Sequence, residues 1–294
     1  MADNEIRVYT PDEIVKEKHE FVKFQVVGLP HSKPLANDET HPLYNERECL
    51  MYRDHNVLLE GLTQGKILTK TVEIKKGLPE EIEKLFGAYE LPEQDKLIQR
   101  CIFMSHLFDA MQEKLPIRKD PERPAWVFPR DYGITHKRRN DLLSSKLVHL
   151  CELACGRTVN HGVVQDEMVS VPFEKDGDLI QFELTVDFMI NSAKALPAYA
   201  YPQMVEITKD IELPDISPLN CTITLTKENI YEIRDIFPID KRSQYPNVHT
   251  AIIHYNQTEV LNLYETPVTE DQILGRTLLK AFAVAAGNAK QRFG

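Results

Sequence analysis

The sequence predicts an α+β fold, in which a mixed, mostly antiparallel sheet with its hairpins packs with several helices and a long C-terminal helix. Two strand-like runs, 163–173 and 179–190, flank an Asp-Gly pair, which is a strong signal for a β-hairpin. Apolar residues recur at helical spacing over 94–114, 135–155 and 269–293. Strands and helices do not alternate in a βαβ rhythm, so the pattern favours an α+β arrangement over a parallel α/β sheet.

Shorter elements are expected before the first long helix. Thr10 and Pro11 match an N-cap and a first helical position, and they predict a short helix to about residue 20. The polar, proline-bearing stretch 31–42 indicates a connector. The other elements expected here are a strand at 22–27, a strand at 49–52, a helical turn at 56–62, a half-buried strand at 67–74 and a short helix at 79–89.

The helix expected at 94–114 ends before Pro116, because proline cannot continue a helix. Its apolar stripe predicts a face packed on the core, formed by Leu97, Ile98, Cys101, Met104, Leu107, Phe108 and Met111. Residues 115–133 hold four prolines and the only Trp of the chain. That composition indicates an extended crossing segment and a boundary between domains or layers. The helix expected at 135–155 stops at Gly156.

Two further strands, at 221–225 and 250–255, are expected before the terminal helix. This helix opens with a capping box made by Thr269 and Gln272. Its alanines indicate close packing on a neighbouring element. We expect its buried face to consist of Leu274, Leu278, Ala281, Phe282, Ala285 and Ala289.

The composition excludes several classes of protein. The chain has 294 residues and a mass of 33.9 kDa, with 42% hydrophobic and 27% charged residues, so it is not a disordered chain. No run is long and apolar enough to cross a membrane. Five cysteines leave one unpaired in any disulfide scheme, which suits a reducing compartment. The first 25 residues hold one Arg and six acidic residues, so no secretory signal or mitochondrial transit peptide is visible there.

Common catalytic motifs are absent from the sequence, including the nucleophile elbow, the glycine-rich phosphate loop and the zinc-protease motif. The densest group of metal-ligand types is His149, Cys151, Cys155 and His161. Because His149 points elsewhere on a helix than Cys151, we favour cysteines that face the core over a zinc site. No catalytic residue, metal site or cofactor is therefore expected.

Acidic residues near the hairpin offer a second candidate for catalysis. Asp176, Asp178 and Glu183 would suit a metal-dependent hydrolase or nuclease if their carboxylates converged on a divalent ion. The two aspartates are better explained as turn residues, and Glu183 as part of the solvent face of a strand. Converging carboxylates would support an enzyme, whereas scattered exposed ones would argue against it.

A basic segment gives the strongest functional signal. Residues 114–139 carry a net charge of +5 within a chain of net charge −10. Trp126, Phe128 and Tyr132 are interleaved with the basic residues, and such aromatic rings can stack on unpaired bases. In the alternative reading, the rings belong to a core and the charges form a solvated rim. We expect limited contact with RNA through Arg118, Lys119, Arg123, Arg130, Lys137, Arg138 and Arg139.

Three of these residues share one local prediction. Lys137, Arg138 and Arg139 are expected on one exposed turn at the start of the helix 135–155. Positive charge there opposes the helix dipole, so a compensating anion such as an RNA phosphate is expected. Pairing of the three with acids of the same chain would argue against RNA contact. A weaker basic cluster, around the strand expected at 67–74, consists of Lys66, Lys70, Lys75 and Lys76.

Four ordered segments carry a further signal: HPLYNERECLMY at 41–52, LLEGLTQGKILTKTVEIKKGLPEEI at 58–82, ENIYEIRDIFPIDKRSQYPNVHTAIIHY at 228–255 and DQILGRTLLKAFAVAAGNAKQRFG at 271–294. In order and spacing they resemble the family of mitochondrial large-subunit ribosomal protein thirty-seven, over residues 41–294. A programmed-cell-death-associated mitoribosomal protein is a relative within that family. The Leu-Thr-Lys-Thr and Gly-Leu-Pro motifs of the second segment fit protein thirty-seven better than that relative.

The resemblance implies a non-catalytic structural protein of the mitochondrial large ribosomal subunit, located in the matrix and supporting mitochondrial translation. It implies contacts with neighbouring large-subunit proteins, above all a heterodimer with the related family member, and with mitochondrial rRNA. On this reading, residues 1–40 are an N-terminal extension and residues 41–294 form the mitoribosomal domain, which the segment 115–134 divides into two lobes. A free protein-interaction factor outside the ribosome is the alternative, ahead of a metal-dependent hydrolase or nuclease.

Overall fold

The structure is a computed structural model that describes most of the chain from Glu48 onward. The described residues are 48–73, 77–107, 112–115, 122–123, 125–126, 129, 131–155, 160–214, 224–229, 233–255, 262 and 266–293. The helix expected at 10–20, the strand at 22–27 and the connector at 31–42 lie outside them, as does the N-terminal extension.

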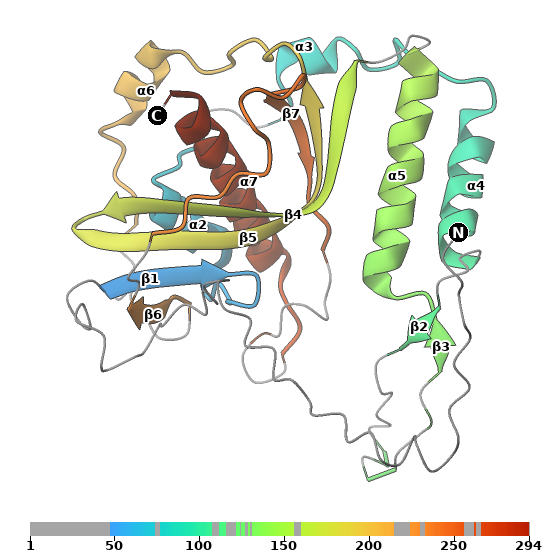
Figure 1. Ribbon diagram of the computed structural model, residues 1–294, viewed down its shortest axis with the longest axis horizontal. Helices are drawn as coiled ribbons and strands as arrows, with labels where there is room; N and C mark the ends of the chain where they lie inside the picture. The colour runs from blue at the N-terminus through green and yellow to red at the C-terminus, as the bar shows by residue number, and fades with distance from the viewer. Residues whose placement is uncertain are drawn as a thin grey trace, which may run out of the picture.

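A mixed sheet forms the centre of the molecule (Figure 1). Its strands are β1 (Glu48–Arg53), β4 (His161–Lys175), β5 (Asp178–Ser192), β6 (Thr226–Asn229) and β7 (Asn247–Ile252). They lie in the order β4–β5–β1–β6, and β7 pairs with the second half of β5. Only the β1–β5 pair of this sheet is parallel among the described strands. The predicted α+β class, with a mostly antiparallel sheet and a long C-terminal helix, is confirmed.

The predicted hairpin is the longest feature of the sheet. β4 and β5 pair in one register from Lys175 opposite Asp178 to His161 opposite Ser192, with an interruption at Asp166, whose φ angle is 55°. The turn residues Asp176 and Gly177 have φ angles of 53° and 94°. A type I′ turn requires positive φ at both central residues, which an Asp-Gly pair allows at low cost. The local turn chemistry therefore sets the register of the whole hairpin.

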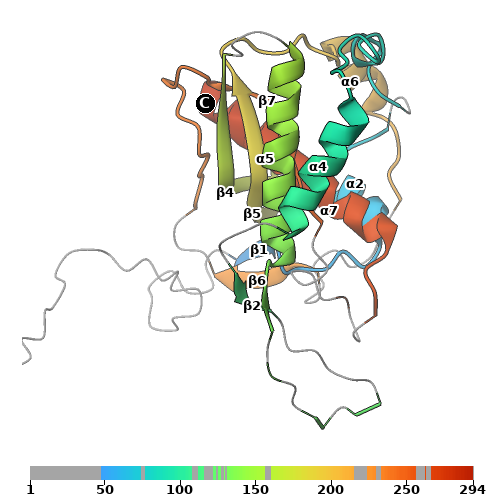
Figure 2. The ribbon, with the colours of Figure 1, turned by 90° about the vertical axis from the view of Figure 1, so that its right-hand side faces the viewer.

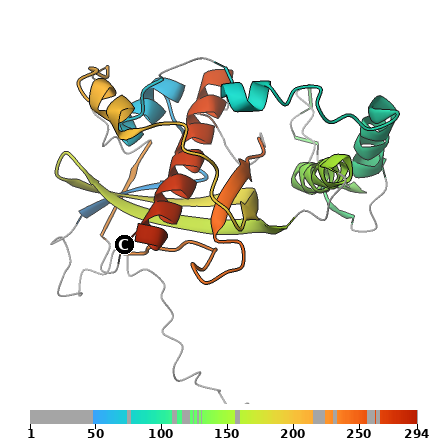
Figure 3. The same cartoon turned by 90° about the horizontal axis from the view of Figure 1, so that it is seen from above.

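The hydrophobic core lies between this sheet and α7 (Glu270–Phe293), which crosses one face of it (Figure 3). Phe173 and Phe182 from the hairpin meet Phe282 from the helix, with ring centroids 4.9–6.0 Å apart and planes at 71–85°. Edge-to-face packing of this kind adds to the free energy gained by burial. Tyr52 of β1 extends the aromatic cluster, with its ring 5.6 Å from that of Phe182.

The helix α2 (Gly61–Thr69) packs closely on α7 through glycines. A Cβ atom on Gly275 would lie 2.5 Å from the carbonyl oxygen of Gly61, and one on Gly65 would lie 3.2 Å from the carbonyl oxygen of Gly275. The strand predicted at 67–74 is wrong in its first half, because Ile67 and Leu68 belong to this helix and are both buried. Glycine lowers helix propensity, so only the contact with α7 explains a helix here.

Two antiparallel helices stand beside the sheet and pack on each other (Figure 2). They are α4 (Gln94–Leu107) and α5 (His136–Cys155), and the short pair β2 (Glu113–Lys114) and β3 (Tyr132–Gly133) lies at one end of them. The segment 115–134 therefore connects these two helices. The division of residues 41–294 into two lobes near this segment stays a prediction.

Two short helices complete the described chain, α3 (Glu80–Glu83) and α6 (Pro202–Thr208). Within the described residues, no helix has the length and apolar character needed to cross a membrane. The strand predicted at 49–52 and the helices at 135–155 and 269–293 are confirmed. The helix expected at 94–114 is shorter and ends at Leu107. Of the strand expected at 221–225, residues 221–223 lie outside the described residues, and β6 begins just after this range, at Thr226.

The face of α7 that meets the core includes Phe282, as predicted, but otherwise differs from the predicted one. Ala281, Ala285 and Ala289 are exposed, and Leu274 is 48% exposed. The buried face consists of Gln272, Gly275, Arg276, Leu279, Lys280, Ala283, Val284 and Gly287. The predicted face contained no charged residue, whereas Arg276 and Lys280 point inward to the carboxylate of Asp54. The predicted capping box is confirmed, since Thr269 and Gln272 exchange backbone-to-side-chain hydrogen bonds of 3.0 and 3.3 Å.

Candidate protein and nucleic-acid interfaces

The basic segment 114–139 is described only in part. Arg118, Lys119 and Arg130 lie outside the described residues. Arg123 is exposed, and its guanidinium carbon lies 5.2 Å from the ring centroid of Trp126, which is 60% exposed. A cation above an aromatic face is a stable arrangement even in water. Arg123 and Trp126 thus present a positive charge and a flat apolar ring on the same exposed stretch.

The start of α5 does not form the exposed turn that was predicted. Lys137, Arg138 and Arg139 are each half-buried. Lys137 is hydrogen-bonded to Asp166 and lies 3.6 Å from Asp141. Burial lowers the pKa of Lys137, but the hydrogen bond to Asp166 and the charge of Asp141 outweigh it, so the pKa is raised overall. Acids of this same chain thus compensate Lys137, which removes the stated reason for an RNA phosphate at that residue.

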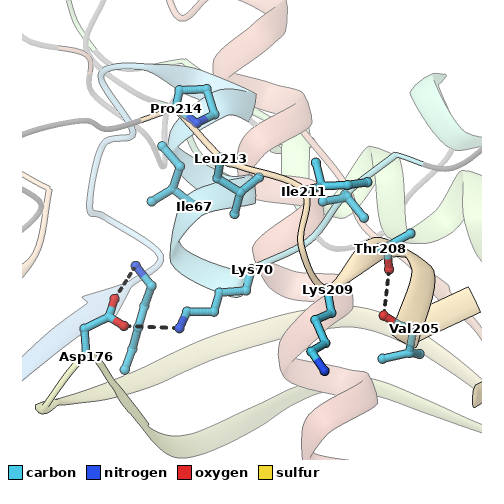
Figure 4. Close-up of a pocket in the computed structure, with 11 residues that line it drawn as sticks. Ile67, Lys70, Asp176, Val205, Thr208, Lys209, Ile211, Leu213 and Pro214 are labelled. Atoms are coloured by element: carbon cyan, nitrogen blue, oxygen red, sulfur yellow. Dashed lines mark hydrogen bonds and ion pairs between the residues drawn. The ribbon is translucent and has the colours of Figure 1, made fainter.

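One residue of the second basic cluster, Lys70, borders a cavity of about 650 Å³ between α2, the hairpin turn and α6 (Figure 4). Lys70 lies 3.1 Å and Lys175 3.5 Å from Asp176, and Lys209 lies 2.7 Å from Glu206. The hydrogen bond from Lys70 lowers the pKa of Asp176. Apolar side chains form the rest of the wall: Ile67, Val72, Val205, Ile211, Leu213 and Pro214. Lys75 and Lys76 lie outside the described residues.

Large apolar side chains are exposed on the α4 side of the molecule. The stripe that was predicted to face the core is only partly covered, since Met104 is 36% and Leu107 61% exposed. Phe103 on the same helix is 62% exposed. The stretch before α4 adds a second group of exposed side chains: Leu78, Ile82, Leu85, Phe86 and Tyr89. Groups of exposed large apolar side chains are typical of protein interfaces.

The cysteines of α5 do not face the core, so that interpretation was wrong. Cys151 and Cys155 are both exposed. His149 and His161 each lie beside Glu152, at 3.2 and 2.8 Å, and not beside the thiols. The densest metal-like group of the sequence therefore does not assemble into a ligand cluster.

The acidic residues near the hairpin do not converge either. Asp176 and Asp178 are exposed at the turn, as turn residues are expected to be. Glu183 is not on an open solvent face, since its carboxylate lies 2.9 Å from Arg53 and is 15% exposed. Arg53 also holds Glu228 through two hydrogen bonds, of 2.5 and 2.9 Å. The hydrogen bond to Glu228 raises the pKa of the Arg53 guanidinium despite its burial.

One polar cluster was missed by the sequence reasoning. Asp141 of α5, Asp187 of β5 and His254, just after β7, lie together although they are far apart in the chain. The available signal was Asp187, a charged residue within an apolar strand that pairs on both sides. A buried charge in such a place requires a partner.

The chain is similar to curated proteins over most of its length. It is 26% identical over 270 residues to "Large ribosomal subunit protein mL37" of Bos taurus, 24% over 270 residues to that of Gallus gallus and 24% over 261 residues to that of Rattus norvegicus. These alignments cover 86–90% of this chain and 55–58% of the relatives. No family model matches the chain.

The chain thus spans little more than half the length of the curated relatives that it matches. The matches recur in mammals and a bird, and they extend well beyond the four segments from which the resemblance was inferred. The predicted resemblance is confirmed: over 86–90% of its length, this chain is similar to the large ribosomal subunit protein mL37.

Proposed function

We propose that the protein is a non-catalytic structural component of the mitochondrial large ribosomal subunit and supports translation in the mitochondrial matrix. The observation that carries this proposal is the similarity to mL37 proteins along 86–90% of the chain. The net charge of −10 fits a subunit that is held mostly by proteins, because an acidic surface is repelled by the RNA backbone.

Protein contacts are assigned to the exposed apolar side chains of α4 and of residues 78–89. Phe103 and Leu107 are both more than 60% exposed, and Phe86 is 96% exposed. Burying a side chain of this size stabilises an interface by about 1.5–3 kcal/mol. The partners in this proposal are neighbouring large-subunit proteins, in particular the related family member as a heterodimer.

Contact with rRNA is assigned to a limited patch centred on Arg123 and Trp126. The exposed guanidinium suits a phosphate and the exposed ring suits an unpaired base. Arg118, Lys119, Arg130, Arg138 and Arg139 belong to the same proposal as further basic residues of this segment. Lys137 contributes least, because Asp166 and Asp141 already compensate its charge.

An enzymatic role receives little support from the described residues. The carboxylates of Asp176, Asp178 and Glu183 are dispersed among exposed positions and an ion pair, so they do not form the site that a hydrolase or nuclease needs. A free protein-interaction factor would use the same apolar surface as a ribosomal subunit. Association with ribosomes separates these two functions.

Sedimentation of a detergent lysate of mitochondria, at moderate and at high salt, tests the proposal. We expect the protein to co-migrate with the large subunit, and to stay bound at high salt because apolar contacts are little screened by ions. The double variant Phe103→Ser and Leu107→Ser should lose co-migration while remaining folded. The matched control is Ile207→Ser on α6, which changes a side chain that is 77% exposed.

Migration as a free species near 34 kDa, or absence from mitochondria, would contradict the proposal and favour the interaction factor. Co-migration lost at high salt alone would keep the protein on the ribosome. That result would shift the main contact from the apolar surface to the basic segment.

A further inference from the structure

A buried polar cluster joins α5 to the sheet, apart from the interfaces described above. The side chains of Asp141, Asp187 and His254 are 8, 12 and 10% exposed. Each offers one ligand atom, and the three atoms lie within 4.8 Å of one another. Among the described residues no other three His, Cys, Asp or Glu side chains come together in this way.

The ring of His254 faces carboxylates on one edge and a hydroxyl on the other. Its Nδ1 lies 3.4 Å from Asp141 Oδ1 and 3.5 Å from Asp187 Oδ1, while its Nε2 lies 2.7 Å from Ser144 Oγ. Nδ1 and Asp141 Oδ1 are buried without a hydrogen-bond partner. Such atoms are costly to bury, so an additional group that contacts both is expected.

The distances suit a metal ion better than direct hydrogen bonds. An N–H···O bond has a length of about 2.7–3.2 Å, and both contacts of Nδ1 are longer. Ligands placed tetrahedrally at about 2.0–2.1 Å from zinc are about 3.4 Å apart. When Nε2–H donates to Ser144, the lone pair of Nδ1 points towards two carboxylates. That arrangement is repulsive until a cation lies between the three groups.

The surroundings fix the two carboxylates and set the local charge. Asp187 Oδ2 accepts a hydrogen bond of 2.8 Å from the backbone N–H of His254. Lys137 lies 3.6 Å from Asp141 Oδ2 and is also bound to Asp166. Contacts of this kind orient ligands in metal sites. With His254 neutral, three carboxylates and one ammonium group give a local charge of −2, which a divalent cation neutralises.

We propose that Asp141, Asp187 and His254 form a binding site for a divalent transition-metal ion of the Zn²⁺ type, with a fourth position for water. The imidazole nitrogen disfavours Mg²⁺ and Ca²⁺, which prefer all-oxygen sites. The ion connects α5, β5 and the chain after β7, so its role is to hold the α4–α5 pair against the sheet. This inference is independent of the proposed function.

Calorimetric titration of the full chain with ZnCl₂, against a weak competing chelator, tests the site. We expect one tight Zn²⁺ per chain. The variants His254→Gln and Asp187→Asn should each weaken the affinity for Zn²⁺ at least tenfold, because each removes one of the three protein ligands. The matched control His249→Gln changes an exposed histidine on β7 and should leave the affinity unchanged. The double variant Cys151→Ser and Cys155→Ser should also bind one Zn²⁺, because these exposed thiols take no part.

Two results would overturn the proposal. Zn²⁺ binding that the cysteine variant abolishes and His254→Gln preserves would assign the ion to the exposed thiols. Wild-type protein that binds no Zn²⁺ would mean that a proton on His254 is the cation between the carboxylates. If the ligand variants do not fold, the absorption spectrum of Co²⁺ bound to the wild-type protein tests the proposal instead. A near-ultraviolet thiolate band would contradict the proposed site. Visible bands of tetrahedral Co²⁺ without a thiolate band would support it.

Discussion

The ammonium group of Lys280 lies 3.1 Å from Oδ1 of Asp54, and its side chain is only 3% exposed. Arg276 reaches the same oxygen atom at 3.1 Å from one helical turn earlier in α7. The other carboxylate oxygen of Asp54 accepts a hydrogen bond of 2.8 Å from the backbone N–H of Thr185. One carboxylate after β1 therefore ties α7 to the central strand β5 and is the anionic partner that two buried cations share.

Replacing Asp54 tests this relationship. Asp54→Asn keeps the shape of the side chain but removes the negative charge that Arg276 and Lys280 share. Breaking a buried ion pair from one side costs about 3–5 kcal/mol. Urea unfolding followed by circular dichroism should report a loss of that size. Asp178→Asn, at an exposed turn position, should change the free energy of unfolding by less than about 0.5 kcal/mol. If both substitutions lowered the free energy of unfolding equally, the charge of Asp54 would not stabilise the fold.

Arg53 provides a second test, because its planar guanidinium binds Glu228 through two nitrogens and Glu183 through a third. Arg53→Lys keeps the charge but cannot reproduce this geometry. Loss of a charge-assisted hydrogen bond should lower the free energy of unfolding by about 1.5–3 kcal/mol. Lys227→Gln breaks an exposed ion pair with Glu48 and should cost less than about 1 kcal/mol. If Arg53→Lys left the free energy of unfolding unchanged, the positive charge alone would account for the link between β1 and its neighbours.

The sequence predicted the parts of the fold that depend on local chemistry. The hairpin follows from Asp176 and Gly177, and the start of α7 follows from Thr269 and Gln272, because each pair satisfies its own backbone. The face of α7 could not be predicted, because it depends on Asp54, more than 200 residues away. Likewise α2 exists through the contact of Gly61 with Gly275, which no local pattern contains.

The same distinction applies to the candidate sites. The basic composition of 114–139 is visible in the sequence, but the compensation of Lys137 by Asp166 appears only when α5 meets β4. The cluster at His254 brings together three distant segments, so spacing could not reveal it. Conversely, the helical spacing of Cys151 and Cys155 led us to expect them in the core, and the fold leaves both exposed.

Because α2 and α7 pack so closely, adding a single methyl group at Gly275 should destabilise the protein. Gly275→Ala places Cβ 2.5 Å from the carbonyl oxygen of Gly61, a contact too short to persist without separating the helices. Overpacking of this kind should lower the free energy of unfolding by about 1–3 kcal/mol. The matched control Ala281→Ser, at an exposed position of α7, should stay within about 0.5 kcal/mol. Chemical denaturation measures both, and a stable Gly275→Ala protein would contradict the close crossing.

Substitutions of Arg123 and of Lys137 should have opposite effects on RNA binding and on thermal stability. Arg123→Gln removes an exposed charge and its stacking on Trp126, so binding of a single-stranded RNA probe should weaken while the melting temperature stays the same. The slope of log binding constant against log salt should fall by about 0.7, since one phosphate contact is lost on a single strand. Lys137→Gln should do the reverse, because its partners are Asp166 and Asp141: the melting temperature falls and the salt slope is unchanged. If Lys137→Gln instead reduces the salt slope and Arg123→Gln does not, the RNA contact lies at the start of α5 and the assignment to Arg123 is wrong.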